Sequence, residues 1–145
     1  MPRKTTDFIV VHCSATRPSM DIGKKEIDRW HRERGFFKIG YHFVIRRDGT
    51  VETGRDLMEA GAHVQGINDR SIGICMVGGV TENDVNTPEC NFTMEQFVTL
   101  TVLLKQMKAQ FPKAKIKGHN EFAKKACPSF DVQAWLKGSI IADLA

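Results

Sequence analysis

The run "DFIVVHCS" at residues 7–14 indicates the kind of fold that the chain adopts. Its apolar residues, 8–11, are consecutive, which is typical of a buried β-strand. Polar residues follow this run at once, beginning with His12. Successive side chains of a strand point to opposite faces of a sheet. Only one of the neighbours His12 and Cys13 can therefore face a given site.

Strand and helix patterns alternate along the rest of the chain. A hairpin that turns at Asp48-Gly49 is expected at 41–54, further strands at 71–79 and 114–119, and helices at 23–35, 93–111 and 131–140. The clearest helix begins with Thr93 and Gln96, which have the spacing of a capping box. This alternation predicts a single α/β domain over residues 1–145, with a central mixed β-sheet flanked by helices.

The composition is that of a globular protein. The 145 residues are 41% hydrophobic and 26% charged, and no apolar run approaches the ~18 residues of a membrane span. The apolar run at 8–11 is also shorter than the roughly 7–15 residues of a signal peptide core, so synthesis in the cytoplasm is expected. The net charge of +4 fits an anionic polymer as partner. Direct binding of nucleic acid is not expected, because no basic stripe has interleaved aromatic residues.

Candidate metal ligands lie at both ends of the chain. The stretch "GHNEFAKKACPSF" at 118–130 contains His119 and Cys127, and His12 ends the first predicted strand. Two histidines and one cysteine would leave a zinc ion one open position, the pattern of a catalytic site. Pro128 favours an extended backbone before it, which would turn Lys125 to the same side as Cys127 and lower the pKa of the thiol.

These residue types also allow an ordinary structural interpretation. A single histidine or cysteine on a strand is more often part of the core than a metal ligand. Cys13, Cys75 and Cys90 are expected to be buried or inert thiols, and His31 and His42 to have structural roles. Composition and spacing alone leave both interpretations open.

Several ordered motifs carry a resemblance to a known family. The resemblance runs from about residue 7 to about residue 136, and the motifs read "FIVVHCSAT", "GYHFVIRRDGTVETGRD", "GAHVQGINDRSIGICMVGG", "NFTMEQF" and "KKACPSFD". Together they resemble the lysozymes of the T-seven-like phages, which are zinc N-acetylmuramoyl-L-alanine amidases of type 2. The resemblance implies the fold that these amidases share with peptidoglycan recognition proteins, and one Zn²⁺ ion per chain.

The resemblance also implies roles for individual residues. It assigns His12, His119 and Cys127 as zinc ligands, Tyr41 and Lys125 as catalytic residues, and His63 and Asn68 as residues that line the substrate groove. Tyr41 would then face the zinc site, and its neighbour His42 would face away from it.

The implied function is that of a phage endolysin. Such an enzyme hydrolyses the amide bond between N-acetylmuramic acid and L-alanine in peptidoglycan and causes host cell lysis. It is made in the host cytoplasm, acts on the periplasmic cell wall after release by a holin, and is expected to be a monomer. The alternative is a non-catalytic peptidoglycan-binding module, but such forms lack the cysteine ligand that Cys127 supplies.

Some family members also bind and inhibit the phage RNA polymerase. An N-terminal arm contributes to this second activity, and only eleven residues precede His12 here. A bifunctional amidase is the remaining alternative, with polymerase inhibition expected to be weak or absent.

Overall fold

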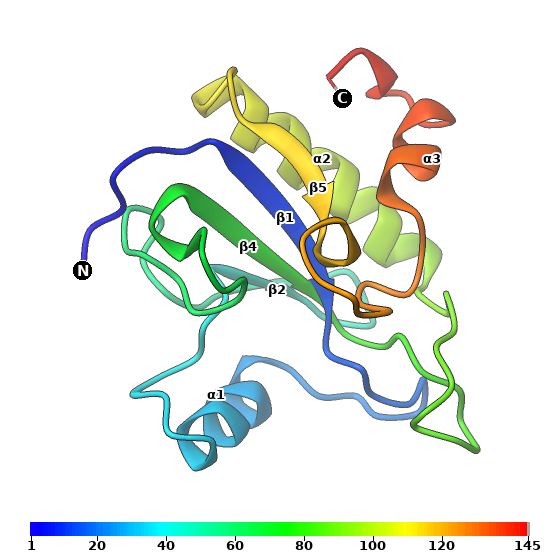
Figure 1. The fold of residues 1–145 in the computed structure, drawn as a ribbon. Coiled ribbons are helices and arrows are strands. Elements are labelled where there is room, and N and C mark those ends of the chain that lie inside the picture. Colours follow the sequence, from blue (N-terminus) through cyan, green and yellow to red (C-terminus); the bar gives the residue numbers. More distant parts are fainter. Residues whose placement is uncertain (145) are drawn as a thin grey trace.

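Five strands form a mixed sheet in the order β3-β2-β4-β1-β5 (Figure 1). The computed structural model describes residues 1–144. The strands are β1 (Phe8–Cys13), β2 (Phe43–Ile45), β3 (Val51–Thr53), β4 (Ser71–Met76) and β5 (Lys115–Gly118). β1 pairs in parallel with β4 and β5, β2 pairs in parallel with β4, and β3 is antiparallel to β2. The predicted mixed sheet is confirmed.

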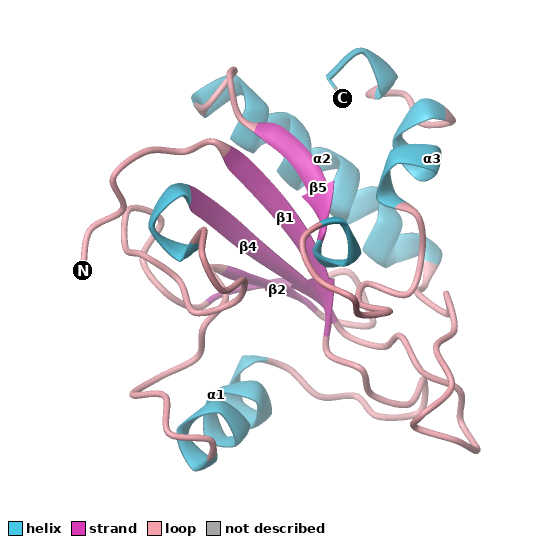
Figure 2. Ribbon diagram, in the orientation of Figure 1, coloured by secondary structure: helices cyan, strands magenta, loops and turns pink. Residues whose placement is uncertain are grey.

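Residues 1–144 also contain three α-helices and three short 3₁₀ turns, which lie between the strands or follow the last of them (Figure 2). They are α1 (Lys24–Glu33), α2 (Met94–Gln110), α3 (Val132–Lys137), η1 (Asn68–Arg70), η2 (His119–Glu121) and η3 (Ala142–Leu144). The capping box of α2 is present, because Thr93 Oγ1 accepts a hydrogen bond from Gln96 N at 3.1 Å and Gln96 Oε1 accepts one from Thr93 N at 2.9 Å. In residues 1–144, no helix has the length and apolar character needed to cross a membrane.

The alternation of side chains along β1 separates the core from the site. Ile9 and Val11 pack against Leu104 of α2 on one face of the sheet. Val10 belongs to a different cluster, on the opposite face. His12 follows Val10 by two residues and so points to this opposite face. Figure 1 shows α2 and α3 on one side of the sheet and α1 on the other. The face away from α2 is therefore the one that carries the candidate site.

Two parts of the structure differ from the sequence-based expectations. The segment after β5 is not extended, since η2 is followed by bends and turns through residue 130. Cys90 is exposed, whereas Cys13 and Cys75 are buried as expected. Cys90 lies in the 81–93 connection between β4 and α2, which runs mostly over the surface.

Candidate metal centre and its cleft

The three predicted metal ligands lie together in the folded chain. In the β1–β5 register, Val11 pairs with Gly118, and the residues that follow them are His12 on β1 and His119, which begins η2 directly after β5. Their ring centroids are 4.6 Å apart. Cys127 reaches the same place from the turn that follows, so that one ligand atom from each of the three residues lies within 4.8 Å of the others. These residues could hold a metal ion.

A chain of hydrogen bonds behind His12 fixes which ring nitrogen faces the cluster. His12 Nε2 is 2.7 Å from His63 Nδ1, and His63 Nε2 is 3.1 Å from Ser71 Oγ. The Ser71 hydroxyl donates its single hydrogen to the carbonyl oxygen of Ile67 at 2.7 Å. Ser71 Oγ must then accept from His63 Nε2–H, and His63 Nδ1 must accept from His12 Nε2–H. His12 Nδ1 is left without a proton.

The protonation of the two rings agrees with this assignment. Burial lowers the pKa of His63 to about 3 and lowers the pKa of His12 well below its usual value. Both rings are therefore neutral at pH 7, and each carries one proton. The unprotonated His12 Nδ1 lies 3.8 Å from Cys127 Sγ. A ring nitrogen held in this way is the usual arrangement of a histidine that binds a metal.

The donor atoms suit a tetrahedral ion such as zinc. Zinc binds nitrogen at about 2.0–2.1 Å and sulfur at about 2.3 Å, which places two tetrahedral donors about 3.5 Å apart. The 3.8 Å between His12 Nδ1 and Cys127 Sγ is close to this separation. Two imidazoles and a thiol are also ligands that zinc prefers.

The thiol of Cys127 is protonated without a metal ion. The hydrogen bond with the Cys13 thiol and burial raise the pKa of Cys127. This direction is opposite to the lowering expected from Lys125, because the contact with Cys13 and the loss of solvent dominate. Cys13 N lies 3.2 Å from Cys127 Sγ and can donate to it. A metal ion held at this sulfur would require the thiol to lose its proton, and the backbone amide of Cys13 would stabilise the resulting thiolate.

Asn68 holds the loop that carries His63 by hydrogen bonds, and Gly73 leaves room for the His63 ring against the sheet. Asn68 Oδ1 accepts hydrogen bonds from the backbone nitrogens of His63 and Val64 at 2.8 and 2.9 Å. A Cβ atom at Gly73 would lie 2.7 Å from Cγ of the His63 ring. A side chain at position 73 would consequently displace the ring from His12.

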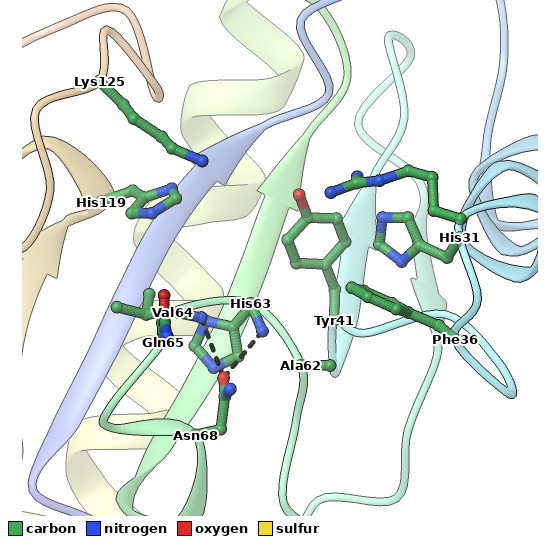
Figure 3. A pocket seen from close by; sticks show the side chains of 11 residues that line it. His31, Phe36, Tyr41, Ala62, His63, Val64, Gln65, Asn68, His119 and Lys125 are labelled. Atoms are coloured by element: carbon green, nitrogen blue, oxygen red, sulfur yellow. Dashed lines mark hydrogen bonds between the residues drawn. The ribbon is translucent and has the colours of Figure 1, made fainter.

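A cleft with a volume of about 480 Å³ opens in front of these residues. It is lined by His31, Arg34, Phe36, Tyr41, Ala62, His63, Val64, Gln65, Asn68, His119 and Lys125. Figure 3 shows His119 and Lys125 on one side and Tyr41 with His31 and Phe36 on the other. The structure thus brings the predicted catalytic pair and the predicted groove residues to one cavity.

Tyr41 and its neighbour His42 have different surroundings, as expected. The Tyr41 ring lies between two histidines, with centroids 5.0 Å from His12 and 5.4 Å from His31. Burial raises its pKa well above the usual value, so the hydroxyl keeps its proton at neutral pH. His42 is buried outside the cleft, where its ring nitrogens contact Glu59 O at 2.6 Å and accept from Gly73 N at 3.0 Å.

The comparison with known proteins decides the family. A model of the family described as "N-acetylmuramoyl-L-alanine amidase" matches residues 2–130, a range that contains every residue of the metal cluster and the cleft. The chain belongs to the N-acetylmuramoyl-L-alanine amidase family. The endolysin of Escherichia phage T7 is 50% identical to this amidase over 133 residues, which are 92% of this chain and 87% of that protein.

Solved structures agree with this assignment. The N-acetylmuramoyl-L-alanine amidase LysC from Clostridium intestinale URNW is 29% identical, with a TM-score of 0.78, and the match covers 92% of this chain and 84% of that one. Drosophila PGRP-LB is 22% identical with a TM-score of 0.78, over 97% of this chain and 85% of that one. The predicted fold, shared by these amidases and the peptidoglycan recognition proteins, is confirmed.

Two residues support the ligands of the amidase: Ser71, which sequence reasoning missed, and Glu121, which it interpreted as a solvated loop carboxylate. Ser71 completes the hydrogen-bond chain behind His12. Glu121 Oε2 accepts from Gly118 N at 2.7 Å and so closes the turn that carries His119. A serine at the start of a strand and a glutamate in a short loop have no local pattern that marks such roles. His31, expected to be structural, does accept a hydrogen bond from Gly40 N at 2.9 Å, and it also lines the cleft.

Proposed function

We propose that this chain is a phage endolysin that hydrolyses the amide bond between N-acetylmuramic acid and L-alanine in peptidoglycan, with one zinc ion held by His12, His119 and Cys127. The observation that carries the proposal is the convergence of these ligands within 4.8 Å at a cleft that Tyr41 and Lys125 also line. The family match and the 50% identity to a phage endolysin support it.

Each residue of the site has a distinct task in this proposal. A zinc ion in the site would act as a Lewis acid toward the scissile carbonyl and toward a water molecule. The Lys125 ammonium would stabilise the negative charge that develops on the carbonyl oxygen during attack. The Tyr41 hydroxyl, which keeps its proton because of its burial, would donate a hydrogen bond to the same oxygen or to the attacking water.

The route to the cell wall follows from the same proposal. An endolysin of this kind is made in the host cytoplasm and meets the wall after a holin permeabilises the inner membrane. Expression of the chain in a Gram-negative host should therefore cause lysis when a holin or a permeabilising agent is added. Lysis at the same rate without either agent would contradict this route.

The bond that is cut tests the proposed function. Digestion of purified peptidoglycan should release stem peptides with new N-terminal alanine and leave the glycan strands intact. The cleft is lined by no Asp or Glu among the described residues, and glycan cleavage usually needs two carboxylates that flank the bond. Labelling of free amino groups and of reducing sugar ends measures both reactions. New reducing ends without new alanine amines would refute the amidase proposal.

The hydrogen-bond chain behind His12 predicts an effect on metal affinity. His63→Ala removes the acceptor of His12 Nε2–H, so the ring loses its fixed orientation and its fixed tautomer. Removal of such a supporting group typically costs 10–100-fold in metal affinity, and a loss of about this size is expected here. Competition with a chelator measures it. His63→Asn, which restores an acceptor, should lose less, and unchanged affinity in His63→Ala would show that the contact with His12 has no such role.

A further inference from the structure

One end of the cleft carries an arginine to which the proposed reaction gives no task. Arg34 is the C-cap of α1, directly after Glu33, and its backbone N–H lies 3.2 Å from Trp30 O and 3.1 Å from His31 O. Gly35 follows with φ +99° and turns the chain away from the helix. The guanidinium carbon of Arg34 is 5.4 Å from the centroid of the Phe36 ring. Arg34 and Phe36 both line the cleft, and Phe36 lies on the same side as Tyr41 (Figure 3).

Arg34 has no acidic partner among the described residues, in contrast to the two arginines within α1. Arg29 pairs with Glu33 at 3.9 Å, and Arg32 pairs with Asp28 at 2.7 Å. Within residues 1–144, no carboxylate oxygen lies within 4.0 Å of a nitrogen of Arg34 or of Lys125. The described lining of the cleft also lacks Asp and Glu. The cleft therefore presents two cations without internal neutralisation and favours an anionic ligand.

The charges of the proposed substrate are unevenly distributed. The N-acetylmuramoyl group and its amide with L-alanine are uncharged, and the first carboxylate beyond that amide belongs to the D-glutamate that follows alanine. Lys125 and the metal ligands define the end of the cleft where the amide would react. The guanidinium lies beside Phe36, across the cleft from Lys125 (Figure 3), and is thus complementary to the peptide part of the substrate and not to the sugar.

The length of an extended peptide sets how far the second stem residue lies from the reacting amide. An extended peptide advances about 3.3–3.6 Å per residue, so the second residue of the stem lies about 7 Å beyond the scissile carbonyl. The Tyr41 ring lies between two histidines of the cleft, with its centroid 5.0 Å from that of His12 and 5.4 Å from that of His31. Arg34 lines the same cleft and lies beside Phe36.

We propose that Arg34 binds the free α-carboxylate of the second stem residue and makes the enzyme prefer stems in which this group is not amidated. The inference rests on the proposed amidase function. Arginine binds carboxylates through two parallel N–H donors, and the Phe36 ring supports the guanidinium from one side. The sugar then lies at the other end of the groove, in the adjoining lobe of about 280 Å³ that Gln65, Phe122 and Ala123 help to line.

The test compares two substrates that differ in a single group. One is N-acetylmuramoyl-L-alanyl-γ-D-glutamyl-L-lysinamide, and the other is the same compound with the glutamate α-carboxylate converted to an amide. The zinc-loaded wild-type protein should cleave the acid with a kcat/KM about tenfold above that for the amide, and mainly through KM, because a charge-assisted contact at a partly exposed site is of this order.

Variants of two arginines on one helix separate the charge effect from a general one. Arg34→Gln keeps most of the side-chain length and removes the charge, so the acid-to-amide ratio should fall to about one, mainly through a higher KM for the acid, while the zinc content stays at the wild-type level. Arg34→Lys should keep an intermediate ratio, since it retains the charge but loses the paired donors. Arg32→Gln, which removes an arginine outside the cleft, should keep the wild-type ratio.

Each outcome decides the inference. A ratio near one in the wild-type protein, or an unchanged ratio in Arg34→Gln, would overturn the role of Arg34 and leave the amidase proposal intact. If the zinc-loaded wild-type protein cleaves neither compound and releases no alanine from peptidoglycan, the role of Arg34 and the amidase proposal are both wrong.

Discussion

Cys127→Ser should lose more than about 100-fold in zinc affinity and retain less than about 1% of the activity, since loss of a direct ligand should exceed the 10–100-fold effect of losing a supporting group. The serine hydroxyl is not deprotonated at neutral pH, so it cannot replace a thiolate that a metal ion has freed of its proton. The two remaining ligands, His12 and His119, would leave the ion only half of its tetrahedral shell. Zinc content after dialysis and the rate of peptidoglycan cleavage measure both effects.

A matched variant separates the loss of the ligand from the loss of a thiol. Cys90 is exposed and lies outside the cleft, so Cys90→Ser should keep wild-type zinc content and activity. Far-ultraviolet circular dichroism of Cys127→Ser should show a folded chain, because the cores on both faces of the sheet do not include Cys127. Full zinc content and full activity in Cys127→Ser would remove this residue from the metal site.

Lys125→Ala should lower kcat by about 10²–10³-fold while the bound zinc stays at the wild-type level. The ammonium faces the cleft and lies within no ion pair of the described residues, so its charge is available to the carbonyl oxygen of the substrate. An interaction made mainly in the transition state lowers kcat and kcat/KM together when it is removed.

The neighbouring lysine provides the control for this prediction. Lys124 carries the same charge on the same turn but does not line the cleft, so Lys124→Ala should cleave at nearly the wild-type rate. Single-turnover measurements at saturating substrate separate the chemical step from product release. A wild-type rate for Lys125→Ala with normal zinc content would exclude the lysine from the chemistry.

The elements of this fold could largely be predicted because each has a local pattern. The apolar run at residues 8–11 became β1, and the capping box of Thr93 and Gln96 begins α2 as the sequence indicates. The alternation of side chains along β1 also predicts that His12 and Cys13 point to opposite faces of the sheet. These features depend on neighbours within one or two turns of helix or strand, which the sequence displays directly.

The surroundings of the site could not be predicted in the same way. His63 contacts His12 across 51 positions of sequence, and the hydrogen bond that orients His63 comes from Ser71 at the start of another strand. No periodicity encodes such contacts, because they arise only when β1 and β4 pair. The direction of the Cys127 pKa was wrong for the same reason, since the dominant neighbour is Cys13, from a strand at the other end of the chain.

The ligand set itself came from two sources of information. The spacing of these residues and the alternation of side chains along strands left open whether His12, His119 and Cys127 bind a metal or belong to the core. The resemblance to the phage amidases selected the first interpretation. The register of β1 and β5 now supplies a physical reason for it, because this register places His12 and His119 side by side at the ends of two parallel strands.

Titration of the metal-free protein with zinc tests the central claim most directly. The rate of release of N-terminal alanine from peptidoglycan should rise in proportion to added zinc and reach a plateau at one ion per chain. The same titration of Cys127→Ser should give no such rise. Full activity of the metal-free wild-type protein, or a plateau that Cys127→Ser reaches equally well, would contradict a zinc site formed by His12, His119 and Cys127.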